Sequence, residues 1–240
     1  GMKRLSLRGE SSRRVLIKIN GQPLPDHSTY GSPLLIDVSL IDKLEVVRGA
    51  ASVVHGSNAL GGVINITTKA ATQGLTQGYA NAGYYSATHG YKLGAGILGA
   101  AAGFDWRLQV AQAEHKDLRV AAKVNNKPAA KDAEETYEKR LRNSGSEQKS
   151  VSAELGYRPN EEQRISWQGD YFDQIAKAWV EPVFNEEKNT SAYTALEFPK
   201  RESTRNALAY SFEQEDGWLQ KINLRAYYQK NKREMYNRID

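Results

Sequence analysis

The stretch VVRGAASVVHGSNALGGVINITTK, residues 46–69, places four glycines, Gly49, Gly56, Gly61 and Gly62, between two β-branched runs. Glycine permits positive φ angles and close approach of the backbone, so the middle of this stretch suits tight turns in a confined space. The flanking runs predict short strands over residues 44–47 and 63–68. The sequence therefore predicts a compact, turn-rich unit at this position.

The residues before this stretch extend the same unit. VLIKING, residues 15–21, is a β-branched run that ends in Asn-Gly, a dipeptide typical of tight turns. PLPDHSTYGSP, residues 23–33, is rich in turn formers and predicts a loop, while residues 36–41 predict a helical turn. We expect a small α+β domain over residues 1–72, followed by a linker.

Apolar and polar residues alternate with a period of two in the second part of the chain, residues 73–240. In one segment Val151, Ala153, Leu155 and Tyr157 alternate with Ser150, Ser152, Glu154 and Gly156, and the pattern recurs at residues 164–171, 207–213 and 221–228. Such alternation predicts strands with one apolar and one polar face. About seven antiparallel strands are expected, which makes the chain mainly β.

The predicted connections between these strands differ in length. A hairpin near residues 88–90 is expected to join the first two strands, and after it short and long connections alternate. Short turns are expected near residues 102–103, 159–162 and 215–217, the last with Asp216-Gly217 as a two-residue turn, and long polar segments occupy about residues 118–147 and 174–203. Alternation alone does not separate a soluble sandwich from a membrane barrel. Short turns at one rim and long loops at the other are typical of outer-membrane barrels, and this favours the barrel.

Composition narrows the classes of function. The chain has no cysteine, which excludes disulfides, thiolate metal sites and cysteine nucleophiles. The net charge of +5 arises in residues 1–20, where six cations accompany one acid, and the remaining residues are balanced. Nucleic-acid binding is not expected, because it needs cations spread along a face. No run approaches the roughly 20 apolar residues of a membrane helix.

Three segments resemble, in order and spacing, the second half of the plug domain of TonB-dependent outer-membrane receptors. They are LRG at residues 7–9, VLIKINGQPL at residues 15–24 and IDKLEVVRGAASVVHGSNALGGVINITTK at residues 41–69. The resemblance implies that residues 1–72 are the C-terminal part of a plug and residues 73–240 the N-terminal portion of a β-barrel. The expected fold is then a partial plug followed by about seven strands of a truncated barrel, in a class with about 22 strands.

The resemblance implies nutrient import without chemical catalysis. Such receptors lie in the outer-membrane lipid of Gram-negative bacteria and take up ferric siderophores, haem or cobalamin, driven by the TonB complex. By resemblance, Arg8 and Arg48 match plug arginines that contact acidic residues of the barrel wall, although solvated surface arginines are the alternative. Gly9, Gly49, Gly56, Gly61 and Gly62 match residues of the plug turns.

The resemblance also implies missing parts. By comparison with the family, a TonB box, the first half of the plug and about fifteen barrel strands are absent, so we expect a fragment that is not transport-competent. Its open sheet edges and apolar faces are expected to be covered by the plug, by a helix at residues 132–143 or by a second copy. This allows self-association and a soluble form of the isolated fragment. The alternative function is a soluble β-rich binding or assembly module derived from receptor sequence.

Candidate ligand-binding residues lie in the loop at residues 23–33. By resemblance this is an apical plug loop, and Asp26, His27, Ser28 and Tyr30 are expected to face the ligand. His27 could ligate haem iron, or it could simply be exposed to solvent. No histidines stand at metal-ligand spacing, and no phosphate loop or catalytic triad motif is found. We expect no enzymatic activity, no metal site and no cofactor bound by this chain.

Overall fold

The computed structural model describes residues 15–23, 41–48, 62–69, 74–125, 137–178, 183–185, 190–192 and 194–239. The chain divides into two compact units, residues 2–71 and residues 72–240. Each unit is built on its own principal β-sheet. Within the part of the chain that the structure describes, no helix has the length and apolar character needed to cross a membrane.

The first unit contains a four-stranded sheet. Its strands are β1 (Val15–Ile19), β2 (Gln22–Pro23), β3 (Ile41–Arg48) and β4 (Gly62–Thr68), in the order β2-β1-β4-β3. β1 runs parallel to β4, and the other neighbours are antiparallel. The buried core consists of branched aliphatic side chains, namely Val15, Ile17, Ile19, Ile64 and Ile66, with Ile41 packed against them. The β-branched runs therefore form the core, because such side chains fit a pleated surface.

Asn20 fixes the turn between β1 and β2. Its backbone N–H donates to the Ile66 carbonyl at 2.8 Å. Its side-chain Nδ2 donates to Thr68 Oγ1 at 2.9 Å, and its Oδ1 accepts from the Thr68 N–H at 3.0 Å. The expected Asn20-Gly21 turn is thus confirmed, and its side chain also joins the turn to the end of β4.

The expected helical turn at residues 36–41 is wrong at its last residue. Ile41 is the first residue of β3, which begins earlier than the strand predicted from residue 44. The register with β4 shifts between Ile41 and Lys43, so Asp42 forms a bulge. Residues 36–40 lie outside the described residues, and the described part of this unit consists of strands and turns.

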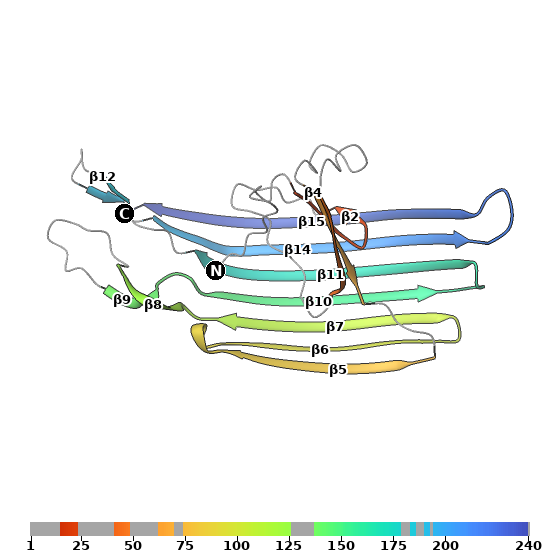
Figure 1. Ribbon diagram of the computed structural model, residues 1–240, viewed down its shortest axis with the longest axis horizontal. Helices are drawn as coiled ribbons and strands as arrows, with labels where there is room; N and C mark the ends of the chain where they lie inside the picture. Colours follow the sequence, from red (N-terminus) through yellow and green to blue (C-terminus); the bar gives the residue numbers. More distant parts are fainter. Residues whose placement is uncertain are drawn as a thin grey trace. The chain divides into compact units, whose positions relative to one another are not determined.

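The second unit is built on a seven-stranded sheet (Figure 1). Its strands are β5 (Thr76–Tyr85), β6 (Gly90–Ala101), β7 (Phe104–His115), β10 (Ser146–Tyr157), β11 (Gln163–Ala178), β14 (Thr194–Glu213) and β15 (Lys221–Ile239). The order is β15-β14-β11-β10-β7-β6-β5 with antiparallel neighbours, so β5 and β15 form its edges. The predicted seven antiparallel strands are confirmed. Their lengths vary from 10 residues in β5 to 20 in β14.

The connections at the two ends of this sheet differ in length (Figure 1). Residues 102–103, 158–162 and 214–220 connect strands at the short-connection end, and residues 86–89, 116–145 and 179–193 at the long-connection end. Ala102 and Gly103 have φ angles of 50° and 80°, the left-handed pair that a two-residue hairpin turn requires. A short 3₁₀ helix, η4 (Ser86–Thr88), forms the link from β5 to β6.

Two expectations for the connections are wrong. Asp216 and Gly217 lie in a longer turn over residues 214–220, which the Gln214 N–H closes on the Gln220 carbonyl at 3.0 Å. The polar segment predicted at residues 174–203 is largely strand, because β11 continues to Ala178 and β14 begins at Thr194. Polar residues are compatible with strands that extend beyond an apolar band.

The helix expected at residues 132–143 is wrong over its described residues. β9 (Tyr137–Leu141) instead pairs antiparallel with β8 (Leu118–Asn125). Ser144 anchors this hairpin, since its Oγ accepts from the Leu118 N–H at 2.8 Å and its N–H donates to Asp117 Oδ1 at 3.0 Å. A second hairpin, β12 (Val183–Asn185) with β13 (Thr190–Ala192), lies in the next long connection.

The two faces of the seven-stranded sheet have opposite chemistry, and their exposure is the reverse of that in a soluble sandwich. On β7, Asp105, Arg107 and Gln109 are buried, at 6%, 4% and 2% exposed. Leu108 and Val110 alternate with them and are 48% and 47% exposed. We call the face of Asp105 the polar face and the face of Leu108 the apolar face.

The apolar face is continuous across the strands. Its central row consists of the register partners Trp106, Leu155, Trp167 and Leu208 on four adjacent strands. On β14, every second residue from Phe212 to Thr204 lies on this face and is uncharged. This uncharged run is about 27 Å long along the strand. The next residue on this face is Glu202, opposite Asp173 and Lys232, so charged groups bound the apolar band.

Candidate functional site

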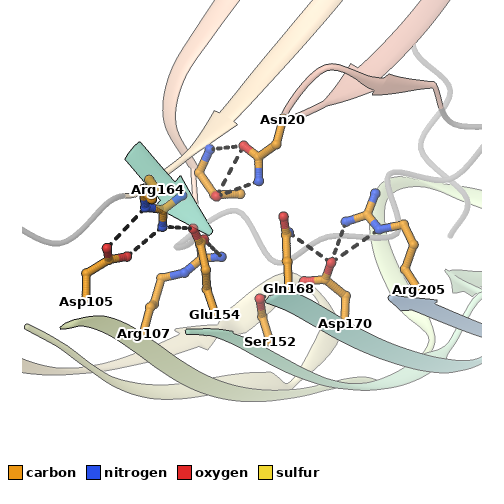
Figure 2. A network of polar contacts seen from close by, with 10 residues as sticks. Asn20, Asp105, Arg107, Ser152, Glu154, Arg164, Gln168, Asp170 and Arg205 are labelled. Atoms are coloured by element: carbon orange, nitrogen blue, oxygen red, sulfur yellow. Dashed lines mark hydrogen bonds and ion pairs between the residues drawn. The ribbon is translucent and has the colours of Figure 1, made fainter. Parts of the chain in front are cut away.

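The polar face carries an ion-pair network near the short-connection end (Figure 2). Asp105 accepts a hydrogen bond from Arg158 Nη1 at 2.8 Å. Arg164 on β11 contacts both oxygens of the same carboxylate, with Nη2 2.6 Å from Oδ1 and Nε 3.1 Å from Oδ2. Charge-assisted contacts of this two-pronged kind are stronger than neutral hydrogen bonds. The Asp105 side chain is 8% exposed, so solvent screens the pair only weakly.

Glu154 on β10 extends the network to a third arginine. Its Oε1 accepts from Arg164 Nη2 at 2.9 Å, and its Oε2 accepts from Arg107 Nη2 at 3.1 Å. Arg107 and Glu154 are register partners, so strand alignment brings them together. Three arginines therefore surround two carboxylates, which leaves one excess positive charge in this group.

Arg107 is the most enclosed arginine of this group. Its side chain is 3% exposed, and among the described residues its Nε and Nη1 have no hydrogen-bond partner. A buried donor without an acceptor costs about 1–3 kcal/mol. Arg107 can therefore accommodate a further acceptor beyond Glu154.

Asp170 on β11 is the centre of a second group. Its Oδ2 accepts from Arg205 Nη2 at 2.8 Å and from Gln168 Nε2 at 3.0 Å, and its Oδ1 accepts from Ser152 Oγ at 2.6 Å. Ser152, Asp170 and Arg205 are register partners on β10, β11 and β14. The strand register thus fixes this row of polar side chains (Figure 2).

Gly156 provides the space for the Asp105 carboxylate. It is the register partner of Asp105 on β10. A Cβ atom at residue 156 would lie 2.4 Å from Asp105 Oδ1 and 2.5 Å from Oδ2, far inside contact distance. A residue with a side chain at this position would displace the carboxylate from its arginines.

The two ion-pair groups form a surface of fixed charges on the polar face of the sheet. Each carboxylate of the two groups is held by an arginine, so none of these three acids is set up as a free general base. Among the described residues, no three side chains of the His, Cys, Asp or Glu type gather at a position that could hold a metal ion. The geometry therefore indicates that this face of the sheet is a polar surface of fixed charges.

Most of the site residues predicted from sequence lie outside the described residues. These are Asp26, His27, Ser28, Tyr30, Arg8, Gly9, Gly49, Gly56 and Gly61. Arg48 is the last residue of β3, and its side chain is outside the described part. Gly62 begins β4 opposite Arg48, with a φ angle of 132°. Their roles as ligand-binding or plug–barrel contacts stay predictions.

Sequence reasoning missed the residues of the ion-pair network. Asp105, Glu154 and Asp170 occupy polar-face positions of alternating strands, and that alternation is the signal the sequence offers for them. Their arginine partners are distant in sequence; Arg164 is 59 residues from Asp105. Only the register of the strands shows which arginine pairs with which acid.

Comparison with known proteins connects both units to one family. Residues 1–63 match the family model described as TonB-dependent Receptor Plug Domain. The FrpB iron transporter from Neisseria meningitidis (F3-3 variant) matches 95% of this chain with a TM-score of 0.71 at 21% identity, over 35% of its own length. The chain is similar to TonB-dependent receptors: residues 1–63 match their plug domain, and the seven-stranded sheet has the fold of strands in their barrels.

Other proteins similar to this chain agree. The Vitamin B12 transporter BtuB of Vibrio vulnificus (strain YJ016) is 39% identical over 84 residues, which are 35% of this chain and 14% of that protein. BtuB of Photobacterium profundum is 27% identical over 173 residues, 70% of this chain and 25% of that protein. The siderophore receptor PirA from Pseudomonas aeruginosa has a TM-score of 0.63 at 16% identity, over 96% of this chain and 35% of its own.

These relatives are named transporters and receptors, so the family is not one of enzymes. This chain spans between 14% and 35% of their lengths. The structural likenesses, at 21% identity or less, concern the fold.

Proposed function

We propose that this chain is part of an outer-membrane receptor that imports a ferric siderophore, haem or cobalamin, with energy supplied through the TonB complex of a Gram-negative bacterium. In this proposal residues 1–72 belong to the plug and the seven-stranded sheet is a portion of the barrel wall. The relatives support nutrient uptake, since their names include vitamin B12 and iron transporters and a siderophore receptor.

The reversed exposure of the seven-stranded sheet carries the proposal. An apolar face that is half exposed and a charged face that is buried suit a wall with hydrocarbon outside and a polar interior. Along a strand tilted by about 35–45°, the band of about 27 Å rises about 19–22 Å, close to the roughly 25 Å of outer-membrane barrels. A soluble module would need to bury this face, and within the described residues the large side chains Leu108, Leu155 and Leu208 are 48–59% exposed.

The alternation of connections supports an orientation. Short turns are typical of the periplasmic rim and longer loops of the extracellular rim. The hairpins β8–β9 and β12–β13 would then lie outside the cell, and the plug would join β5 at the periplasmic rim. In this orientation the polar face lines the interior, and its arginines and carboxylates face the path of the imported nutrient.

The seven strands on their own are proposed not to transport. β5 and β15 are the edges of the sheet, and unpaired backbone groups at an edge cannot be satisfied in hydrocarbon. Closure therefore requires additional strands or self-association through these edges. The apical loop with Asp26, His27, Ser28 and Tyr30, and the plug arginines Arg8 and Arg48, belong to the same proposal as ligand and barrel contacts.

Energised uptake tests the function. The receptor encoded by the gene that contains this chain is expressed in a Gram-negative host without its own iron-chelate and cobalamin receptors, in strains with and without TonB. Accumulation of a labelled ferric chelate, haem or cobalamin that needs TonB is the expected result. Failure to accumulate any of the three, with the protein present in the outer membrane, would overturn the proposal.

The 240-residue chain expressed alone is the matched comparison. No TonB-dependent accumulation is expected from it. Uptake by this chain would disprove the requirement for further strands. A soluble, monodisperse chain with its tryptophans inaccessible to lipid would favour the binding-module alternative.

A further inference from the structure

The two borders of the apolar band differ in chemistry. At the short-connection end the apolar face ends in uncharged side chains, and one row across four adjacent strands consists of Tyr157, Ile165, Tyr210 and Leu224. At the long-connection end the same face of these strands continues into five lysines and five acidic residues. They are Lys149, Lys177, Lys200, Lys230, Lys232, Glu147, Asp173, Glu197, Glu202 and Glu234. We call these ten residues the charged belt, which borders the band at one end only.

The ion pairs within the charged belt are looser than those of the polar face. In four pairs the lysine nitrogen lies 3.5–3.8 Å from a carboxylate oxygen, outside the usual hydrogen-bond range of about 2.7–3.2 Å. The pairs are Lys149–Glu147, Lys177–Glu197, Lys200–Glu202 and Lys232–Glu202. The side chains of these lysines are 40–58% exposed, and exposed pairs contribute about 0–1 kcal/mol. These ammonium groups can therefore exchange a carboxylate for another anion at little cost.

The lysines of β14 and β15 share one carboxylate. Glu202 pairs with Lys200 on its own strand at 3.5 Å and with Lys232 across the strands at 3.8 Å. Lys230 lies opposite Thr204, where the apolar band ends, and forms no ion pair with a described residue. The ammonium groups in this part of the belt are therefore only partly neutralised by ion pairs.

Two acidic residues of the belt likewise form no ion pair with a described residue. Asp173 lies opposite Lys149 and Glu202, and Glu234 lies opposite Lys200. Five lysines balance five acidic residues, so the belt has no net charge. It nevertheless leaves groups of both signs without an ion-pair partner in the described part of the chain.

A headgroup layer that contains phosphates and divalent cations fits such a surface. In the orientation proposed above, the belt lies at the level where the hydrocarbon of the outer leaflet meets the headgroups. Lysine side chains at this level extend along apolar surface and place their ammonium groups among the headgroups. An anionic lipid surface attracts each nearby lysine by about 1 kcal/mol. Carboxylates repel phosphates, but they are good ligands for the divalent cations that lie between phosphates.

We propose that the charged belt binds a glycolipid of the outer leaflet that carries several phosphate groups, with the lysines on its phosphates and the carboxylates on the accompanying Mg²⁺ or Ca²⁺. The proposal rests on the membrane placement proposed above, but its ligand lies outside the wall and is distinct from the imported nutrient. A phospholipid with a single phosphate would satisfy fewer of the lysines. The uncharged border at the other end of the band requires no such lipid.

Lipid A with and without its phosphate groups tests this site. Binding to the receptor encoded by the gene that contains this chain is measured in detergent by native mass spectrometry, with Mg²⁺ or with EDTA. The variants are Lys232→Gln, which removes a charge of the belt, Lys232→Arg, which keeps it, and Lys232→Gln combined with Lys230→Gln. Lys221→Gln is the matched control, because it makes the same change on the same strand at the short-connection end, on a similarly exposed side chain.

We expect Lys232→Gln to weaken binding of bisphosphorylated lipid A by about fivefold and the double variant by about tenfold to thirtyfold, as the attraction of each lysine predicts. Lys232→Arg and Lys221→Gln should bind nearly as the unaltered receptor does. Lipid A without phosphates should bind weakly and equally to all variants. Equal effects of Lys232→Gln and Lys221→Gln, or equal affinity for lipid A with and without phosphates, would overturn the site.

The carboxylates are tested by Glu202→Gln combined with Asp173→Asn. This variant should bind lipid A more tightly in EDTA, because the lysines lose competing carboxylates, and it should gain less from added Mg²⁺. The same gain from Mg²⁺ with and without these two acids would overturn their assignment. Inorganic phosphate in excess should not displace lipid A, and displacement would mean that the lysines bind free phosphate instead of a lipid.

Uptake measurements separate this site from the proposed import function. Phosphate-independent binding of lipid A, in a receptor that still accumulates its nutrient with TonB, overturns the belt and leaves the import function standing. Phosphate-dependent binding that Lys232→Gln weakens, in a receptor without TonB-dependent uptake, supports the belt and counts against the import function.

Discussion

Arg164 reaches over β10 to bind Asp105 with two hydrogen bonds, of 2.6 Å and 3.1 Å. The strand between them carries Gly156 at the position opposite Asp105, so no side chain blocks the contact. The bridge ties β7 to β11, which are not neighbours in the sheet. It strengthens three strands of the wall at the end where they are joined by short turns.

Replacement of Gly156 by alanine should destabilise the protein. The new Cβ would meet the Asp105 carboxylate at 2.4 Å and separate it from Arg164 and Arg158. A loss of about 1–3 kcal/mol in the free energy of unfolding is expected, the cost of leaving buried polar groups unsatisfied. Denaturant unfolding in detergent measures it. Gly83→Ala is the control, since its Cβ meets ordinary contacts of 3.7 Å or more, and equal stability of the two variants would contradict the prediction.

Removal of Asp170 should lower the free energy of unfolding by more than removal of an exposed acidic residue does. Asp170→Asn leaves the Arg205 side chain, 7% exposed, without its counter-charge, and a loss of about 1–3 kcal/mol is expected. Glu213→Gln breaks the pair with Lys221, whose side chains are 69% and 57% exposed, and should cost less than about 1 kcal/mol. A double-mutant cycle of Asp170 and Arg205 measures the coupling. Similar losses at the buried and the exposed pair would refute this difference.

Trp106 and Trp167 should be in contact with lipid. They belong to the central row of the apolar face, separated only by Leu155. In vesicles of lipids brominated on the acyl chains, we expect strong quenching of their fluorescence and little quenching of Trp218, which lies in the turn at residues 214–220. Single-tryptophan variants assign the signals. Equal quenching of all of them would argue against the proposed placement of the band.

An arginine on the apolar face should hinder membrane insertion. Leu155→Arg places a charge in the middle of the band, where the cost in outer-membrane barrels is about 2–4 kcal/mol. Ser150→Arg makes a comparable change on the polar face, where a charged side chain is tolerated. The yield of folded protein in vesicles distinguishes the two. Equal yields would mean that the apolar face is not in hydrocarbon.

Glu45 in β3 should titrate below the usual range for a glutamate. Hydrogen bonds from Lys43 and then from Asn65 lower its pKa from the ordinary value of 4.5. Its stabilising contribution is therefore present above about pH 4.5 and is lost as the pH falls through the lowered folded-state pKa. A ¹³C NMR titration of the carboxyl group measures the midpoint. Lys43→Met should raise that midpoint, and an unchanged midpoint would rule out Lys43 as the main cause.

The sequence was informative wherever a local pattern decides the structure. The alternation of Val151, Leu155 and their neighbours predicted strands with two faces, and Asn20-Gly21 predicted a turn, because pleat and turn conformation depend on adjacent residues. The helix expected at residues 132–143 failed for the opposite reason. Favourable i,i+4 charges are weak, and pairing of β9 with β8 overrides them.

The candidate site depends on long-range register, which no local pattern contains. Arg205 and Asp170 meet because β11 and β14 align in a particular way, with a shift between Gln174 and Ala176 farther along. A displacement of β14 by one residue would move Arg205 to the face opposite Asp170 and break the pair. The charge on the polar face could be predicted from alternation, but not the identity of each pair.

The unequal strand lengths have a consequence for contact with large molecules. β14 and β15, with 20 and 19 residues, rise about 60–65 Å, whereas β5, with 10, rises about 30 Å. If the short turns lie at a common depth, the sheet ends in a slanted edge that is highest at Thr194 and Ile239. An antibody or a phage tail approaching from outside the cell would then reach the tips of β14 and β15 well before those of β5, which makes the higher side the preferred epitope.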